Sequence, residues 1–191
     1  MRQMLVGALA LAALLGNGDG ASANLLANGG FETGNFTGWT VTDGGIVGGI
    51  TVDNFNQHSG SFGADFYDRL AGDSITQSVV TLPGSTYRLS FFLENNTTGA
   101  NEFTASFNGV GLLDLVNAVG GGGSATQYTF DVVATSASSS VAFAGYNVPG
   151  TSTLDDVSLD LLAADVPEPA TLALLGTALA GLALTRRRMR D

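Results

Sequence analysis

The sequence contains no cysteine and no lysine, and its one histidine is His58. Without cysteine there can be no disulfide, so an exported domain of this composition must rely on its hydrophobic core. One histidine is too few for a zinc site, which needs several His or Cys ligands. The nucleophile elbow, the His-Glu-x-x-His motif and the phosphate-binding loop are also missing. A Ser-His-Asp arrangement or a pair of carboxylates are the enzymatic alternatives that residue counting leaves open.

Positive charge is scarce, and the ends of the chain hold most of it. The chain has 17 acidic residues and seven arginines, for a net charge of −10. Five of the arginines lie in the end segments, so residues 24–165 keep 14 acids and only Arg69 and Arg88, a net charge of −12. Such a surface repels phosphate backbones, which excludes nucleic acid as a partner. It suits calcium or neutral partners such as glycans.

The N-terminal segment is typical of a secretory signal peptide. Met1-Arg2 gives a positive start, residues 4–15 form an apolar run, and Ala21-Ser22-Ala23 fits the small-x-small cleavage rule. A first core helix is the alternative, but the glycines within residues 16–20 would break it at once. We therefore predict that residues 1–23 are a signal helix and that the mature chain is exported.

The C-terminal segment combines a proline corner, an apolar run and a basic cluster. Val166-Pro167-Glu168-Pro169 stops the preceding strand, because proline lacks a backbone N–H and fixes φ. Residues 170–185 carry no charge, and as a helix they would reach roughly 24 Å, a little under a hydrocarbon core of about 30 Å. Arg186-Arg187-Arg188 would stay on the cytoplasmic side. We predict a linker over 163–169, a transmembrane helix over 170–185 and a basic tail over 186–191; the alternative is a buried C-terminal helix.

This order of features resembles the PEP-CTERM sorting signal of Gram-negative bacteria, and the resemblance covers Val166–Arg190. It implies recognition by an exosortase-type processing enzyme and processing near the Pro-Glu-Pro motif. It also implies export to the cell surface or the extracellular matrix. The apolar helix would hold the exported domain at the inner membrane until processing takes place.

Residues 24–162 are predicted to form one all-β domain. The segment is rich in Gly, Ser, Thr and Asn, its short apolar runs are separated by turn signals, and no convincing amphipathic helix lies within it. Asn108-Gly109 predicts a type I′ hairpin turn, which needs positive φ at both positions. Regular strand spacing without helices predicts an antiparallel β-sandwich, most simply a jelly roll. The expected strands are 39–42, 45–52, 61–66, 74–81, 86–94, 102–107, 112–116, 126–134, 139–146 and 152–161.

A second resemblance rests on motifs spread over this domain. In order along the chain, they resemble galactose-binding-like jelly rolls, especially carbohydrate-binding modules of the type 4/9 group, which implies a carbohydrate-binding β-sandwich. The resemblance spans most of residues 24–161. The motifs are Asn28–Gly34 with Gly38-Trp39-Thr40, His58–Phe62, Ile75–Val79, Gly84–Phe91 and Leu154–Leu159.

The same resemblance implies one structural calcium ion. In that family an acid of the N-terminal segment and an acid of the last strand commonly share the ion, and the matching residues are Glu32 and either Asp155 or Asp156. Consecutive residues of a strand point to opposite faces, so one of the two aspartates is the expected ligand, with Asp156 preferred. Backbone carbonyls of Gly30 and of the turn at 58–61 could complete the six to eight oxygens. The alternative is three solvated acids without a metal.

Glycan-binding residues are harder to predict, because nothing in their spacing shows that they converge. Trp39 could stack on a sugar, although a Gly-Trp-Thr strand start favours a core anchor. Three aromatic side chains near loops could line a groove: Phe55, Tyr67 and Tyr146. Five polar side chains could bond sugar hydroxyls: Asp65, Asp68 and Arg69, with Asn54 and Gln57.

Together these features predict a non-enzymatic exported surface or matrix protein that binds extracellular polysaccharide. One alternative is a purely structural or adhesive matrix or biofilm protein without a glycan site. The other is a small polysaccharide-active enzyme.

Overall fold

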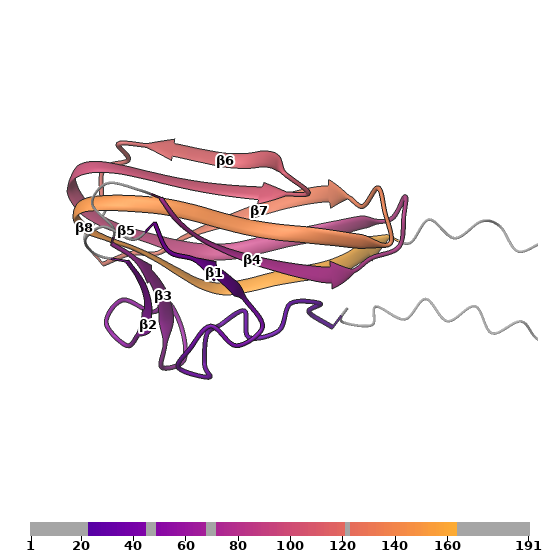
Figure 1. Ribbon diagram of the computed structural model, residues 1–191, viewed down its shortest axis with the longest axis horizontal. Coiled ribbons are helices and arrows are strands. Elements are labelled where there is room, and N and C mark those ends of the chain that lie inside the picture. The colour runs from indigo at the N-terminus through magenta and orange to yellow at the C-terminus, as the bar shows by residue number, and fades with distance from the viewer. Residues whose placement is uncertain (1–22, 45–48, 68–71, 121–122, 164–191) are drawn as a thin grey trace, which may run out of the picture.

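The computed structural model describes residues 23–44, 49–67, 72–120 and 123–163, and in these the protein is all-β (Figure 1). The predicted signal helix and sorting tail lie outside the described residues. Every strand pair is antiparallel, as the sequence predicts. The strands are β1 (Thr40–Thr42), β2 (Ile50–Asp53), β3 (Gly63–Phe66), β4 (Asp73–Val80), β5 (Thr86–Phe107), β6 (Val110–Val116), β7 (Thr126–Val133) and β8 (Ser138–Ala163).

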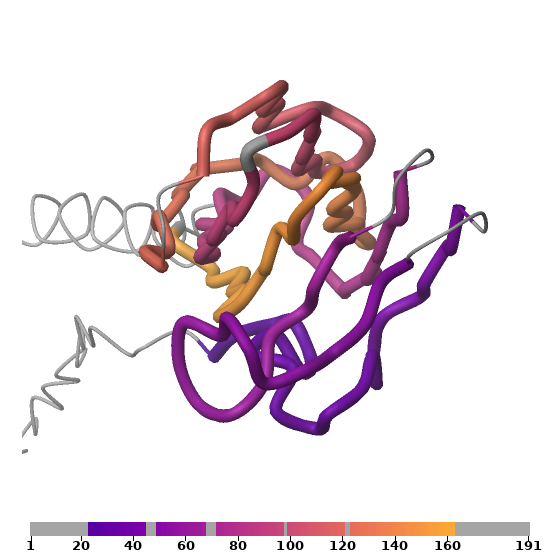
Figure 2. Tube along the Cα trace, turned by 90° about the vertical axis from the view of Figure 1, so that its left-hand side faces the viewer, coloured from indigo at the N-terminus to yellow at the C-terminus, as the bar shows by residue number. Residues whose placement is uncertain are grey.

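Two long strands, β5 and β8, run the length of the molecule and belong to both layers of the sandwich (Figure 1). The C-terminal half of β5 and the N-terminal half of β8 form a first sheet, in the order β6-β5-β8-β4-β1. The other halves form a second sheet, in the order β7-β5-β8-β3-β2. The strands therefore curl around a central space, which the core side chains fill (Figure 2).

The length of these two strands differs from the prediction. Residues 95–99 and Pro149-Gly150 fall between expected strands, yet they lie inside β5 and β8. The chain bends at these positions instead of reversing, with a shift in register between Thr97 and Ala100. Four of the ten expected strands are thus halves of two bent strands.

The predicted hairpin at Asn108-Gly109 is confirmed. It joins β5 to β6, and the two residues have φ of 51° and 75°. These are the positive values that the turn requires.

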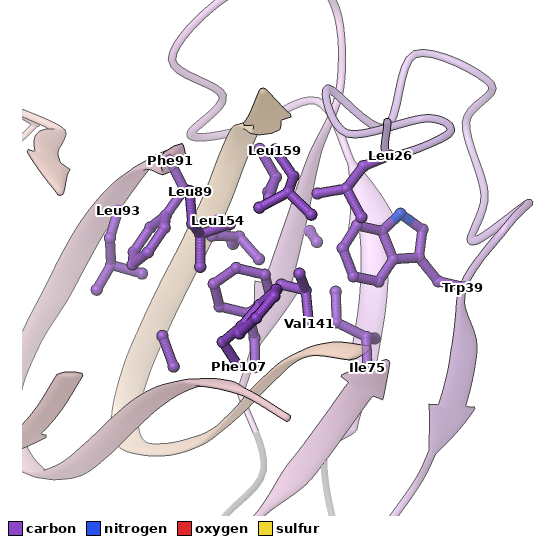
Figure 3. Packing of buried hydrophobic residues seen from close by; sticks show 14 of the residues in the cluster. Leu26, Trp39, Ile75, Leu89, Phe91, Leu93, Phe107, Val141, Leu154 and Leu159 are labelled. Atoms are coloured by element: carbon purple, nitrogen blue, oxygen red, sulfur yellow. The ribbon is translucent and has the colours of Figure 1, made fainter. Parts of the chain in front are cut away.

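The core lies between the two sheets, and aromatic side chains cross it. Phe66 of the second sheet meets Phe103 of the first edge to face, with ring centroids 5.4 Å apart. Phe91 meets Phe143 in the same way at 5.0 Å. Figure 3 shows how the side chains gather, with Trp39 closing one end over Leu26 and Ile75. All described core residues fall within positions 26–161, so this segment holds the whole described core.

Candidate functional site

The N-terminal segment lies along the end of β8 and brings Glu32 to the last strand. The backbone N–H of Leu25 donates to Leu159 O (3.0 Å), and that of Val157 donates to Gly29 O (2.9 Å). A β-carbon at Gly29 would lie 1.9 Å from Val157 O, so this close approach requires glycine. The Asn-Gly-Gly-Phe-Glu motif is therefore a docking segment.

Glu32 holds the turn of residues 58–62, which lies in the loop between β2 and β3. Its Oε1 accepts hydrogen bonds from the backbone N–H groups of Ser61 (2.9 Å) and Phe62 (3.1 Å), and Oε2 accepts from Ser61 (3.1 Å). Gly60 stands beside the carboxylate with φ of 61°, and a β-carbon there would lie 2.2 Å from Oε1. The turn thus needs glycine for space and for backbone conformation.

The two aspartates of β8 hold the same turn from the other side. Asp155 Oδ2 accepts from the backbone N–H groups of His58 (2.8 Å) and Ser59 (2.9 Å), and Oδ1 accepts from that of Asp156 (2.6 Å). Asp156 Oδ1 accepts from the Ser59 hydroxyl (2.8 Å), and Oδ2 lies 2.7 Å from His58 Nδ1. The imidazole also stacks on Phe92, with ring centroids 3.5 Å apart.

Glu32 and both aspartates therefore hold one turn, whereas strand alternation predicted that only one of the two aspartates would face it. Asp156 has φ of 50°, so the regular alternation of a strand is broken at this position. All six carboxylate oxygens of these three residues accept from protein donors, so a calcium ion would have to displace those donors. Burial raises the pKa of Asp155, and its backbone hydrogen bonds partly offset this. Within the described ranges, no three His, Cys, Asp or Glu side chains are grouped as a metal site. The residues as arranged do not fit the ion that the resemblance implies, and we expect calcium to bind only if these donors move away.

A separate feature lies on the outer face of the first sheet. An open depression of about 200 Å³ is lined by Tyr146, Glu102 and Thr104 with Ala144 and two glycines. The register explains its composition, because Glu102 lies opposite Tyr146 and Thr104 lies opposite Ala144 across β5 and β8. Small side chains thus form the floor, with an aromatic ring and a carboxylate beside them.

The structure does not gather the predicted glycan ligands into one place. Tyr146 lines the depression on the first sheet. Tyr67 (38% exposed) follows β3 of the second sheet, and Phe55 (81% exposed) lies in the loop between β2 and β3. Asp68 and Arg69 lie outside the described residues.

Trp39 is the core anchor that its strand start favours, and its prediction as a possible sugar ligand is wrong. It is 7% exposed, and its ring packs against Phe31 and Phe143 at centroid distances of 5.9 and 6.1 Å. Its indole N–H donates to Asn28 O (3.2 Å), so both its apolar body and its polar tip are used inside the domain (Figure 3). No ring face is left for a sugar.

Sequence reasoning missed Glu102, and it offered Asp65 as a sugar ligand without indicating that this residue is 4% exposed within a row of polar residues on the outer face of the second sheet. Asp65 of β3 pairs with Thr153 of β8, which pairs with Glu94 of β5. Their neighbours Ala64 and Leu154 point into the core, so strict alternation could have assigned these polar side chains to the other face. Their side-by-side position depends on register, which the sequence does not give.

Comparison with known proteins supports two parts of this description. Residues 165–188 match the PEP-CTERM protein-sorting motif. The motif implies an exported protein that is processed by an exosortase at the membrane. A search of curated proteins finds no match to the sequence. The described residues contain no helix that is long and apolar enough to cross a membrane. The predicted span over residues 170–185 lies outside the described residues.

The fold is that of carbohydrate-binding modules. A family 61 module in complex with β-1,4-galactotriose is 21% identical, with a TM-score of 0.60 over 74% of this chain and 100% of that one. A family 22 xylan-binding domain from Paenibacillus barcinonensis is 16% identical, with a TM-score of 0.53 over 75% and 97%. A cleaved adhesin domain of Lys-gingipain from Porphyromonas gingivalis is 16% identical, with a TM-score of 0.57 over 70% and 96%. The described chain is thus a β-sandwich like these modules, joined to a PEP-CTERM sorting motif.

Proposed function

We propose that this chain is an exported, non-enzymatic glycan-binding protein of the cell surface or extracellular matrix, delivered by an exosortase-type system. The depression on the outer face of the first sheet carries the proposal. Tyr146 offers a ring to the C–H face of a sugar, and Glu102 and Thr104 offer oxygens to its hydroxyls. Small floor residues leave the backbone surface open to a flat polymer chain.

Charge narrows the class of ligand to neutral glycans. Asp114 on β6 lies opposite Thr104, so a second carboxylate joins Glu102 on this side of the sheet. Arg88 is the sole arginine of the described ranges, and it is paired with Asp131 of the second sheet through Nε (2.9 Å). An acidic face without a described cation disfavours uronate polymers and favours uncharged ones.

Adhesion without a glycan site is the second candidate function, because the same fold occurs in an adhesin domain. A polysaccharide-active enzyme is less well supported. Catalysis by two carboxylates needs a close pair that substrate can reach. Asp65 and Asp53 are a close pair, but Asp65 is only 4% exposed.

The test is affinity electrophoresis of residues 24–163 in gels that contain neutral galactan or xylan, or anionic alginate. We expect retardation by a neutral polymer, and we expect Tyr146→Ala to remove it. Phe55→Ala is the matched control, because that aromatic is exposed but lies away from the depression. If the Phe55 variant loses retardation and the Tyr146 variant keeps it, the glycan site lies in the loop between β2 and β3 and not in the depression. Absence of binding to any glycan would favour adhesion.

A further inference from the structure

Three acidic residues lie near one another on the outer face of the second sheet: Asp53, Asp65 and Glu94. Asp65 and Glu94 lie on either side of Thr153 in one cross-strand row. Asp65 is 4% exposed, Glu94 is 7% exposed and Thr153 is 2% exposed. Asp53 of β2 lies diagonally across from Asp65, because its direct partner is Gly63. The four strands β2, β3, β8 and β5 each contribute one residue to this cluster.

The surroundings of Asp65 favour a bound proton. Asp65 is 4% exposed, the Thr153 hydroxyl donates to its Oδ1, and Asp53 stands diagonally beside it on β2. Two carboxylates only accept, so a hydrogen bond between two carboxyl groups exists only when one of them is protonated. A buried acid beside a second acid, with no described cation to offset the charge, is therefore expected to hold a proton that the two carboxyl groups can share.

Neighbouring charges do not supply a substitute for that proton. The described titratable groups on this face are Glu94 of β5, Asp155 of β8, Tyr67 after β3 and His58 of the covering loop. His58 is paired with Asp156, and Arg88 is paired with Asp131 farther along β5. The cluster therefore has a surplus of negative charge.

We propose that Asp53 and Asp65 share one proton that fastens the β2–β3 hairpin to β8, so that the hairpin is held tightly in acid and loosens toward neutral pH. The hairpin is suited to local opening, because β2 pairs with β3 alone and β3 pairs with β8 over three residues. Burial, with smaller contributions from Asp53 and Glu94, raises the pKa of Asp65 to about 7, which agrees with this assignment.

The sign of the effect follows from linkage. An opened hairpin returns Asp65 to water, where its carboxyl ionises near pH 4, whereas in the closed hairpin it keeps its proton up to about pH 7. Opening therefore becomes easier by up to about tenfold per pH unit between these values, and the effect levels off above them. Hydrogen exchange measures this opening directly.

The experiment compares amide exchange of residues 50–66 at pH 4.5, 5.5 and 6.5 in residues 24–163, corrected for intrinsic exchange rates. We expect protection of the hairpin to fall about tenfold per pH unit in the wild type. In Asp65→Asn the fall should vanish, because an amide can keep the contacts without titrating.

Asp114→Asn is the matched control, since Asp114 is an exposed acid on β6 of the other sheet, and it should behave as the wild type. If Asp65→Asn does not fold, Asp53→Asn on the edge strand tests the same shared proton. Hairpin protection that is constant with pH in the wild type, or that falls equally in the wild type and the folded variant, would overturn the proposal.

Discussion

Gly60→Ala tests whether Glu32 and the 58–62 turn act as one unit. The new methyl group would lie 2.2 Å from Glu32 Oε1 and 2.5 Å from Cδ, so the carboxylate must move. A moved carboxylate loses its hydrogen bonds to the backbone N–H groups of Ser61 and Phe62. Gly60 also has φ of 61°, a region that alanine adopts at a cost.

The expected loss has two parts. The left-handed backbone costs about 1 kcal/mol for alanine. Loss of the charge-assisted hydrogen bonds costs about 2 kcal/mol, toward the low end of the usual range because these bonds are exposed. Gly60→Ala should therefore destabilise residues 24–163 by about 3 kcal/mol, measured by urea unfolding.

Two further variants separate these parts. Gly109→Ala has φ of 75° and no atom within 4 Å of its new β-carbon, so it should lose only the backbone part, about 1 kcal/mol. In a Glu32→Ala background, Gly60→Ala should also cost about 1 kcal/mol, which gives a coupling energy of about 2 kcal/mol. Equal losses at Gly60 and Gly109, or a Gly60 loss that does not depend on Glu32, would refute the reasoning.

Three other outcomes are expected. The free energy of unfolding of the wild type, compared with that of Asp65→Asn, should fall by about 4 kcal/mol from pH 4 to pH 7. The reason is that Asp65 loses its proton at lower pH in the unfolded chain than in the folded one. Urea unfolding at several pH values measures this difference. Trp39→Ala should cost about 3–5 kcal/mol in the same assay and should leave glycan retardation intact at temperatures where the variant is folded. Calcium should leave the melting temperature unchanged; a rise that Glu32→Gln abolishes would show instead that the ion displaces the donors around Glu32.

Local rules predicted most of the fold. Alternation of apolar residues places Leu89 and Phe91 in the core, and Asn108-Gly109 forms the turn that its φ preference requires. The same rules fail at residues 95–99, where the expected strand ends but the chain continues in β5. Asn95 Nδ2 donates to Ala118 O (2.8 Å), as does Asn101 Nδ2 (3.0 Å). Side-chain amides thus satisfy a bend in a continuous strand, and composition alone does not distinguish such a bend from a loop.

The candidate site was predictable only where a motif fixed it. Resemblance placed Glu32 near one of Asp155 and Asp156, and the structure shows it with both of them on one turn. It gave no indication that Asp65 would meet Glu94, because Thr153 joins them only when three strands far apart in sequence adopt one register. Contacts of this kind depend on tertiary pairing and not on local pattern.

The bend in β5 also separates the two proposals physically. Glu94 lies on the outer face of the second sheet, and Glu102 lies eight residues later on the outer face of the first. Between them the strand passes from one layer to the other, and the amide of Asn101, 2% exposed, is hydrogen-bonded at the corner. Asp65 and Tyr146 therefore lie on opposite sides of the packed core. Among the described contacts, these two residues share no hydrogen bond. Distant sites without common partners contribute additively, so loss of the shared proton and loss of glycan binding are independent failures.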